Sequence, residues 1–351
     1  MLPALLAALT ILTAPAAAAG VVTTSAGPMQ ITAMATGLDE TWALDFLPDN
    51  RFLVTERDGR LTLFPASGGA DQPIAGLPQV AAQGQGGLLD VTVARDFART
   101  GEIFLTFARP QDGGGAGTAL AVARLDPAAS RLDDLRLLFE MAPGVRGGQH
   151  FGSRVVEGTD GHLYLTLGDR GTREHAQDLS RHEGSVVRLT RDGRPAGAPE
   201  LAAARPELYS KGHRNPQGAA LDLQGNLWVV EHGARGGDEL NRVQAGRNYG
   251  WPVITYGRDY DGSRIGEGRA RPGLEQPVHY WDPSIAPSGL LFHSGRGIPA
   301  WKGDVFTGSL NAGFISRLDP DRGHAEERIE APETGRVRDL AEAADGAIWF
   351  L

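Results

Sequence analysis

Short apolar segments alternate along the chain with tight turns that contain glycine or asparagine. A turn residue, one variable residue and then alternating apolar or aromatic residues recur as "NRFLV", "GEIFL", "GHLYL", "GNLWV", "GDVFT" and "GAIWF", beginning at Asn50, Gly101, Gly161, Gly225, Gly303 and Gly346. Each copy follows a second short apolar segment, such as "WALDFLPD" or "LDVTVARDF". Each repeat therefore predicts a strand, a turn and a strand.

The spacing of the six copies predicts an all-β fold, a six-bladed β-propeller. Successive copies lie from the low forties to the high seventies of residues apart, as expected for propeller blades with loop insertions. Turns of this kind also occur in β-sandwiches and irregular all-β folds, which stay open as alternatives. The longest gap, from Gly225 to Gly303, is polar and glycine-rich. We expect it to form a long loop on one face, where the rigid scaffold would support a site.

Composition narrows the classes of function. The 351 residues include 48 glycines and 22 prolines, which suit many short strands joined by turns. The formal net charge of −9 argues against nucleic acid as a partner, because binding phosphates needs clustered basic residues. The chain contains no cysteine, so disulfides, zinc–thiolate sites and thiol nucleophiles are excluded.

The N-terminus predicts export. The segment "MLPALLAALTILTAPAAAAG" is apolar from Leu2 to Leu12, and Ala17 and Ala19 suit cleavage before Gly20. We therefore expect a secretory signal at 1–19 and one propeller domain at 20–351, in a periplasmic or secreted protein with no stable membrane insertion. A membrane anchor is the alternative, which Pro15 and the short apolar run weaken.

Several polar residues fall where the propeller predicts loops at the mouth of its central channel. His150 precedes one repeat strand and Asp169 follows the next, so a hairpin would bring the two together. An aspartate that accepts a hydrogen bond from one imidazole nitrogen fixes the tautomer that a general base needs. A structural histidine bonded to a loop carbonyl fits the pattern equally well. Arg214 and Asn215 take the corresponding place in the next unit, where arginine is either an anion clamp or a surface residue.

A series of motifs over nearly all of the mature chain carries a family resemblance. These motifs are "QGQGGLLDV", "GGQHFGSR", "LGDRG", "GHRNPQG", "EHGARGGDELN", "NYGWPVITYG", "APSG" and "RVRDL". In this order they resemble the soluble PQQ-dependent aldose sugar dehydrogenases, the glucose/sorbosone dehydrogenase family. The family fold is a six-bladed propeller, in agreement with the number of repeats.

The resemblance implies roles for matched residues. His150 corresponds to the base that takes the proton of the anomeric hydroxyl while hydride passes to the quinone C5 of PQQ, and Asp169 to the carboxylate that orients it. Arg214 and Asn215 match residues beside the quinone oxygens, where positive charge stabilises a developing oxyanion. The resemblance further implies cofactor contacts from Gln85, Ser284, Asn311, Arg336 and Arg338. PQQ carries three carboxylates, which explains arginines gathered in an acidic protein.

Calcium is the second cofactor that the resemblance implies. One Ca²⁺ would bridge PQQ and the backbone carbonyls of Gly233 and Ala234, and a structural Ca²⁺ would use Glu239 and the carbonyl of Tyr249. A solvated loop acid is the alternative for Glu239. Two departures stand out: Asn311 replaces a lysine that commonly pairs with PQQ, and the chain stops soon after "GAIWF", so the last blade is expected to close by other means or the sequence is truncated.

The predicted reaction is oxidation of an aldose at C1 to a lactone, with electrons passed to a quinone, cytochrome or dye. Two other classes stay open: a calcium-dependent lactonase or esterase propeller, which would hold its metal through several side-chain carboxylates and amides, and a non-catalytic binding propeller. The His150–Asp169 pair with Arg214 argues against the non-catalytic propeller.

Overall fold

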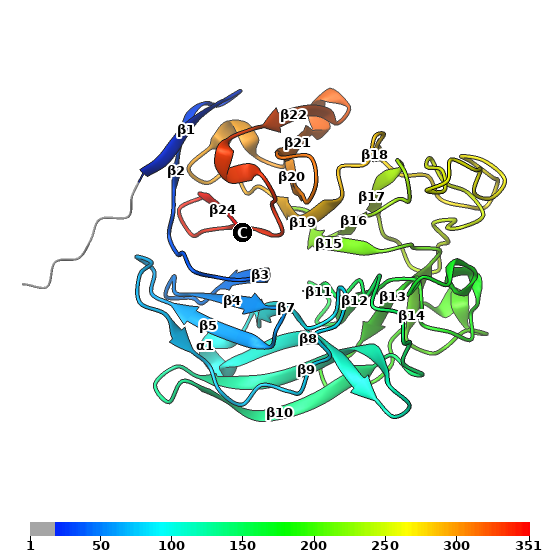
Figure 1. Cartoon of the computed structure of the whole chain (residues 1–351), viewed down its shortest axis with the longest axis horizontal. Coiled ribbons are helices and arrows are strands. Elements are labelled where there is room, and N and C mark those ends of the chain that lie inside the picture. The colour runs from blue at the N-terminus through cyan, green and yellow to red at the C-terminus, as the bar shows by residue number, and fades with distance from the viewer. Residues whose placement is uncertain (1–17) are drawn as a thin grey trace, which may run out of the picture.

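A computed structural model describes residues 18–351, so most of the predicted secretory signal lies outside the described residues. Within 18–351 no helix combines the length and apolar character needed to cross a bilayer. The chain forms antiparallel sheets arranged around a centre, as Figure 1 shows, which confirms the all-β propeller class.

Five of the sheets have four strands each, and each is built from strands consecutive in sequence. The first is β3 (Thr41–Phe46), β4 (Phe52–Glu56), β5 (Arg60–Phe64) and β6 (Gln72–Pro73). The second is β7 (Leu88–Val93), β8 (Glu102–Gln111), β9 (Gly115–Asp126) and β10 (Arg131–Glu140). The third is β11 (Val155–Glu157), β12 (Leu163–Leu167), β13 (Ser185–Leu189) and β14 (Leu208–Lys211). The fourth is β15 (Pro216–Leu221), β16 (Leu227–Glu231), β17 (Asp238–Arg242) and β18 (His279–Trp281), and the fifth is β19 (Pro287–Phe292), β20 (Val305–Ser309), β21 (Ile315–Asp319) and β22 (Ala325–Ile329).

The prediction of six blades is wrong, because the described chain has five blades of four strands. The sixth repeat forms only the two-stranded sheet of β23 (Leu340–Glu342) and β24 (Ile348–Phe350), which contacts β19 on one side and β3 on the other. The repeat marks the turn between the first two strands of a unit, so it carries no information on whether a third and fourth strand follow.

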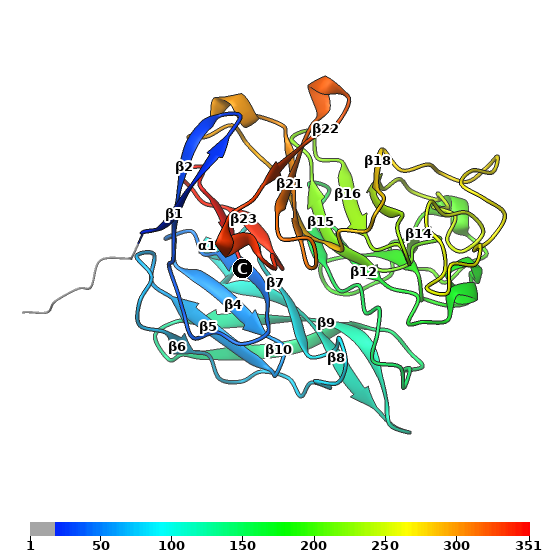
Figure 2. The ribbon, with the colours of Figure 1, turned by 45° about the horizontal axis from the view of Figure 1, so that its top comes forward.

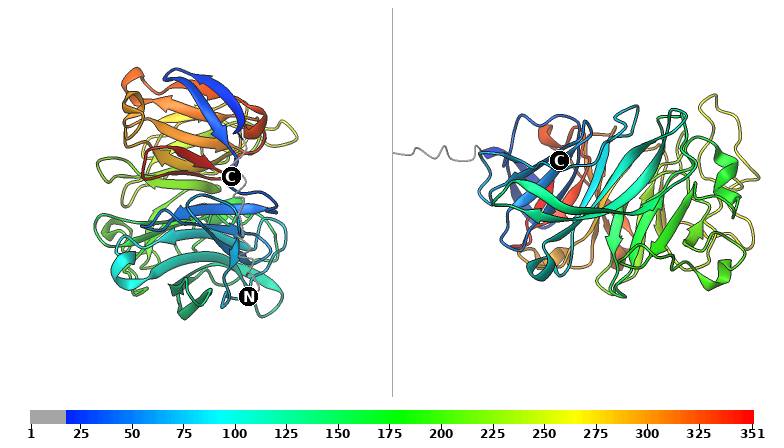
Figure 3. Two further views of the ribbon diagram at one scale, coloured as in Figure 1. Left: turned by 90° about the vertical axis from the view of Figure 1, so that its left-hand side faces the viewer. Right: turned by 90° about the horizontal axis from the view of Figure 1, so that it is seen from below.

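The N-terminal hairpin of β1 (Ala18–Thr24) and β2 (Gly27–Thr32) packs beside the fifth blade, as Figure 3 shows. Val22 and Met29 of the hairpin join the apolar cluster that includes Phe306 and Leu340. Arg317 on β21 also donates a hydrogen bond to the Ser25 hydroxyl, 3.1 Å away. The hairpin therefore covers apolar side chains at the position of the two-stranded sheet.

Helices are few and short. They are α1 (Phe97–Thr100) and the 3-10 helices η1 (Arg173–Gln177), η2 (Pro199–Leu201), η3 (Pro299–Trp301), η4 (Pro320–Arg322) and η5 (Pro332–Thr334).

The six repeat turns share one backbone conformation. All six turn residues have a positive φ between 67° and 89°, at Asn50, Gly101, Gly161, Gly225, Gly303 and Gly346. Side chains with a Cβ rarely adopt this left-handed conformation, which glycine and asparagine tolerate best. The turn between the first two strands therefore explains the repeat seen in the sequence.

Adjacent blades bury both of their faces against each other. On β8, Ile103, Leu105 and Phe107 pack into a cluster with the first blade, whereas Phe104 packs into a cluster with the third. Successive side chains of a strand point to opposite faces, so a strand buried on both faces is apolar throughout. This packing holds the inter-strand loops in fixed positions around the channel.

Candidate functional site

His150 and Asp169 meet at the ends of the β11–β12 hairpin. The His150 Nδ1 atom lies 2.6 Å from Asp169 Oδ1, and the His150 backbone N–H donates to Gln85 Oε1 at 2.8 Å. The loop after β12 passes directly against His150: a Cβ on Gly168 would lie 2.1 Å from the His150 carbonyl oxygen. Only glycine allows this close approach, which sets the distance between the two side chains.

The Asp169 carboxyl is almost fully buried yet ionised. Burial by itself raises its pKa, but the hydrogen bond and charge of His150, the Gly171 N–H and the charge of Arg214 outweigh burial, so the pKa of Asp169 is lowered. An ionised carboxylate only accepts hydrogen bonds, so the proton between the two residues is on His150 Nδ1. The Nε2 atom of His150 is then the nitrogen that can accept a proton.

Arg214 lies beside this pair. Its carbonyl accepts a hydrogen bond from the Asp169 N–H at 2.8 Å. The guanidinium donates to the His232 carbonyl at 3.2 Å and to the Tyr260 hydroxyl at 3.3 Å. Its Nε is buried and has no hydrogen-bond partner within residues 18–351. Arg214 is therefore held in place with a donor still unpaired.

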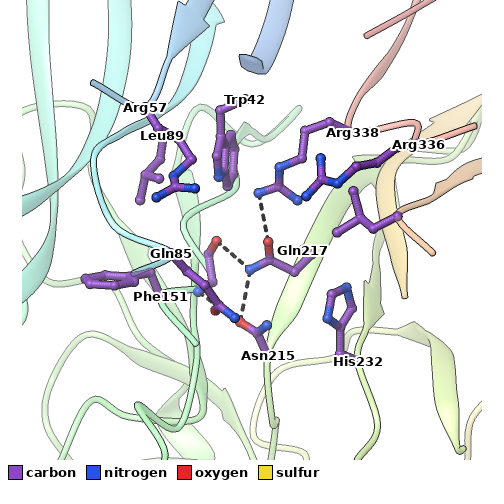
Figure 4. A pocket seen from close by; sticks show the side chains of 12 residues that line it. Trp42, Arg57, Gln85, Leu89, Phe151, Asn215, Gln217, His232, Arg336 and Arg338 are labelled. Atoms are coloured by element: carbon purple, nitrogen blue, oxygen red, sulfur yellow. Dashed lines mark hydrogen bonds between the residues drawn. The ribbon is translucent and has the colours of Figure 1, made fainter. Parts of the chain in front are cut away.

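A cavity of about 110 Å³ opens at the centre of the propeller, and Figure 4 shows its lining, which includes Phe151 and Gly152, next to His150 in sequence, and Gln85, which accepts the His150 N–H. The lining is rich in hydrogen-bond donors and comes from several blades: Trp42, Arg57, Gln85, Leu89, Phe151, Gly152, Asn215, Gln217, His232, Leu310, Arg336 and Arg338. Of the expected cofactor contacts, Gln85, Asn215, Arg336 and Arg338 lie in this lining.

A hydrogen-bonded chain of side chains crosses the cavity wall. Arg338 Nη2 donates to Gln217 Oε1 at 2.8 Å, and Gln217 Nε2 donates to Asn215 Oδ1 at 2.9 Å, as the dashed lines in Figure 4 indicate. The Trp42 ring contacts two guanidinium groups, with its centroid 4.1 Å from that of Arg338 and 4.2 Å from that of Arg154. These contacts order the cationic wall in advance of any ligand.

The electrostatics of the cavity favour an anion. Burial, followed by the charge of Arg154, holds the pKa of Arg338 well below its usual range. Burial and the charges of Arg214 and Arg338 lower the pKa of His232 to about 3, so its imidazole is neutral at physiological pH. Burial is the larger cause of both shifts, and the neighbouring positive charges add to it; a negative ligand would offset this second contribution.

Sequence reasoning missed Trp42, Arg57, Gln217 and His232 as parts of this wall. Gln217 and His232 lie within the motifs "GHRNPQG" and "EHGAR", next to residues that were assigned roles. Trp42 lies in the apolar segment "WALDF", where nothing distinguishes it from a core residue. Only the assembled ring of blades brings these side chains together.

Ser284 and Asn311 do not line the cavity. The Ser284 hydroxyl donates to Asp238 Oδ1 at 3.0 Å, and the same carboxylate oxygen accepts the Gly233 N–H at 2.8 Å. Asn311 is exposed in the turn after β20, although its neighbour Leu310 reaches the cavity. Asp238 therefore joins the loop of Gly233 and Ala234 to the loop of Ser284.

Glu239 lies in a separate group of polar side chains with Glu231 and Asn241. Asn241 Nδ2 donates to Glu239 Oε2 and to Glu231 Oε1, each at 3.0 Å. Burial and then the charge of Glu231 raise the pKa of Glu239. The Asn241 Oδ1 atom is buried without a hydrogen-bond partner in the described part of the chain. Residues 18–351 contain no group of three or more His, Asp or Glu side chains arranged around a metal position.

Tyr249 is buried close to this group. Its ring stacks on that of His213 with centroids 4.6 Å apart, and His213 Nδ1 lies 2.9 Å from Glu231 Oε1. The Tyr249 hydroxyl donates to the Arg242 carbonyl at 2.6 Å. The side chain of Tyr249 is thus used in packing, and a metal would have to bind its backbone carbonyl.

A propeller with an imidazole–carboxylate pair beside an arginine-lined central cavity defines the class of protein, and comparison with known proteins defines the family. The family model described as Glucose / Sorbosone dehydrogenase matches residues 38–351. The chain belongs to this family, which confirms the predicted resemblance and the oxidoreductase class.

Individual relatives agree with this assignment. The chain is 42% identical over 323 residues to the aldose sugar dehydrogenase YliI of Escherichia coli (strain K12), covering 90% of this chain and 87% of the relative. The solved apo-form structure of the soluble aldose sugar dehydrogenase from Escherichia coli is similar with a TM-score of 0.85 and 40% identity, covering 90% and 93% of the two chains. A PQQ-bound aldose sugar dehydrogenase from Streptomyces coelicolor is similar with a TM-score of 0.76 and 29% identity, covering 90% and 89%.

Proposed function

We propose that this protein oxidises aldose sugars at C1 to lactones with PQQ as cofactor, and passes the electrons to a quinone, a cytochrome or a dye. The observation that carries the proposal is the His150–Asp169 pair, 2.6 Å apart, at the edge of a cavity walled by arginines. The PQQ-bound relative from Streptomyces coelicolor supports the choice of cofactor.

The donor set of the cavity fits PQQ. Arg336 and Arg338, with Gln85 and Asn215, present guanidinium and amide groups of the kind that bind carboxylates. The unpaired Nε of Arg214 adds a buried donor next to His150. These residues would hold the cofactor, and the bound quinone would supply a two-electron acceptor for hydride.

Three residues of the chain would then have different roles in the reaction. His150 Nε2 would take the proton from the C1 hydroxyl as the C1–H bond breaks and the C1–O bond becomes a carbonyl. Asp169 would keep the proton on Nδ1 and stabilise the imidazolium that forms. Arg214, held by the His232 carbonyl and Tyr260, would stabilise negative charge that develops on oxygen.

Calcium belongs to the same proposal. The carbonyls of Gly233 and Ala234 would bind one Ca²⁺ beside the cofactor. Glu239 and the carbonyl of Tyr249 would bind another, which would relieve the raised pKa that Glu239 owes to burial and to Glu231. The buried, unpaired Asn241 Oδ1 adds an oxygen donor of the type that Ca²⁺ prefers.

Reconstitution tests the proposal. Purified apoprotein is mixed with PQQ and Ca²⁺ together, with each alone and with neither, and dye reduction is measured with a panel of mono- and disaccharides. We expect activity only with both additions and a lactone product. Absence of dye reduction, with PQQ binding demonstrated by absorbance, would reject the aldose assignment. Lactone hydrolysis with Ca²⁺ but without PQQ would instead favour the lactonase class.

We also propose that the protein works in the periplasm or outside the cell. The proposal depends on the sequence of residues 1–19. Fractionation of expressing cells, with N-terminal sequencing of the exported form, checks it: a mature N-terminus at Gly20 is expected.

A further inference from the structure

Trp251 makes a direct contact with the proposed catalytic pair. It lies in the long segment between β17 and β18, which Figure 2 shows as a yellow excursion at one side of the molecule. The indole Nε1 donates a hydrogen bond to Asp169 Oδ2 at 2.8 Å. The ring is 7% exposed and packs with Ala176 and Ile265. A residue 82 positions away in sequence is thus bonded to the carboxylate that holds His150.

Within residues 18–351, this is the hydrogen bond that fixes the second oxygen of Asp169. The first oxygen, Oδ1, interacts with His150 Nδ1 at 2.6 Å and with the Gly171 N–H at 2.8 Å. Rotation about the Cβ–Cγ bond of an aspartate is soft, so contacts to one oxygen alone leave the plane of the carboxylate loosely defined. With Trp251 on Oδ2, both oxygens have donors and the plane is set.

The same indole also contacts the cationic side of the site. The guanidinium of Arg214 lies 5.3 Å from the centre of the ring, within the range of a cation–π interaction. Arg173 lies 5.8 Å from the ring and forms an ion pair with Asp259 at 2.9 Å. The indole therefore contacts both Arg214 and Arg173, and Arg173 is itself paired with Asp259. These contacts fix the position of the ring.

We propose that Trp251 is a positioning residue that fixes the Asp169 carboxylate and, through it, the orientation of the His150 imidazole. The inference rests on the proposed role of His150 as the base. Trp251 acts through Asp169 and need not touch sugar or cofactor for this role, so its loss should affect the chemical step more than binding.

The variant Trp251→Phe removes the N–H donor and keeps an aromatic ring beside Arg214. We expect kcat to fall by about tenfold to a hundredfold, the range for losing one hydrogen bond to a charged group, with KM and the Kd for PQQ changed less than about threefold. Trp228→Phe is the matched control, because Trp228 Nε1 donates to Asp222 Oδ2 at 2.9 Å in the β15–β16 turn, at the opposite end of β16 from His232. The control should keep the wild-type kcat.

A measurement on the apoprotein separates this inference from the proposed function. In protein labelled with ¹⁵N-histidine, the His150 signals are assigned by their absence in His150→Ala, and the proton on Nδ1 is read from two-bond couplings. We expect a single Nδ1–H tautomer in wild type and Trp228→Phe, and mixed tautomers in Trp251→Phe. This result does not depend on PQQ or on any sugar.

Two outcomes would overturn the positioning role: wild-type kcat in active Trp251→Phe, or an unchanged His150 tautomer in the folded apo variant.

If Trp251→Phe does not fold, the indole N–H signal of Trp251 is followed in wild type and in Asp169→Ala. An upfield shift on losing Asp169 is expected, and an unmoved signal refutes the contact. A wild type with no dehydrogenase activity would reject the proposed function and leave the tautomer result intact.

Discussion

Replacing Arg154 by leucine tests whether the buried ion pairs next to the cavity are shielded from water. Arg154 is 5% exposed, and its guanidinium makes ion pairs with Asp90 at 3.0 Å and with Asp339 at 2.8 Å. It also donates to the Gln217 carbonyl at 2.9 Å and lies over the Trp42 ring. The leucine side chain would leave two buried carboxylates without their cation.

The expected loss of unfolding free energy in Arg154→Leu is large and depends on pH. Removing one partner of a buried ion pair costs about 3–5 kcal/mol of unfolding free energy, because the remaining charge stays desolvated. Burial, opposed by Arg154 and assisted by Asp339, already raises the pKa of Asp90 to about 6, from an ordinary value near 4. A carboxyl whose pKa is raised in the folded state does not lower the unfolding free energy at a pH below its unfolded pKa. As pH rises from the unfolded pKa through the folded pKa, the carboxyl destabilises the fold. Without Arg154 this cost grows, so the deficit of Arg154→Leu should be larger at pH 8 than at pH 5.

Urea unfolding followed by tryptophan fluorescence at both pH values measures the deficit, provided that the m-values agree. Arg124→Leu is the matched control: Arg124 also pairs with two carboxylates, Asp133 and Asp134, each at 3.2 Å, but it is 47% exposed. Exposed pairs contribute about 0–1 kcal/mol, so the control should lose little. A loss below about 1 kcal/mol in Arg154→Leu at pH 8, or the same loss at both pH values, would show that the network is solvated.

Three further predictions concern the proposed cofactors and base. His150→Ala should lower kcat by about 10²–10⁴ and leave PQQ affinity nearly intact, because a base that only moves a proton adds little to cofactor binding; wild-type turnover in the dye assay would place the base elsewhere. Asn311→Lys should tighten PQQ binding roughly tenfold by adding a cation next to Leu310, since Arg317 is already paired with Asp304 and Glu327; unchanged or weaker binding on titration of the apoprotein would remove Asn311 from the cofactor contacts. Glu239→Gln should abolish most of the rise in Tm that Ca²⁺ gives to the wild type over EDTA; an equal rise in both proteins would place the structural calcium elsewhere.

The strand–turn–strand unit could be predicted from sequence because its cause is local. A left-handed residue at the turn restricts that position to glycine or asparagine, and the alternation of apolar residues after it follows from the pleat. The number of complete blades could not be predicted in this way. Whether a third and fourth strand join a sheet depends on pairing between segments that carry no such mark, and at Gly346 only two strands form.

In the candidate site, too, contacts with a local cause could be predicted from sequence and contacts between distant segments could not. His150 and Asp169 are the two ends of one hairpin, so their approach follows from the predicted topology. Trp42 and Arg57 come from the first blade, and Gln217 and His232 from the fourth. Their approach requires closure of the whole ring, which local patterns do not describe. Trp251 is a further example, because a long irregular segment carries it to Asp169.

The balance of charge around the cavity explains how an acidic protein can favour an anion at its centre. Arg154 is paired with Asp90 at 3.0 Å and with Asp339 at 2.8 Å, so this buried group has no excess of positive charge. Arg336 and Arg338, which line the cavity, form no ion pair with an acid in residues 18–351, and neither does the adjacent Arg214. A neutral ligand would leave these guanidinium groups uncompensated, whereas a ligand with several carboxylates would pair with them. Since the group around Arg154 has no excess of positive charge, the preference for an anion arises from the arginines of the wall, and substitutions there should change cofactor affinity more than stability.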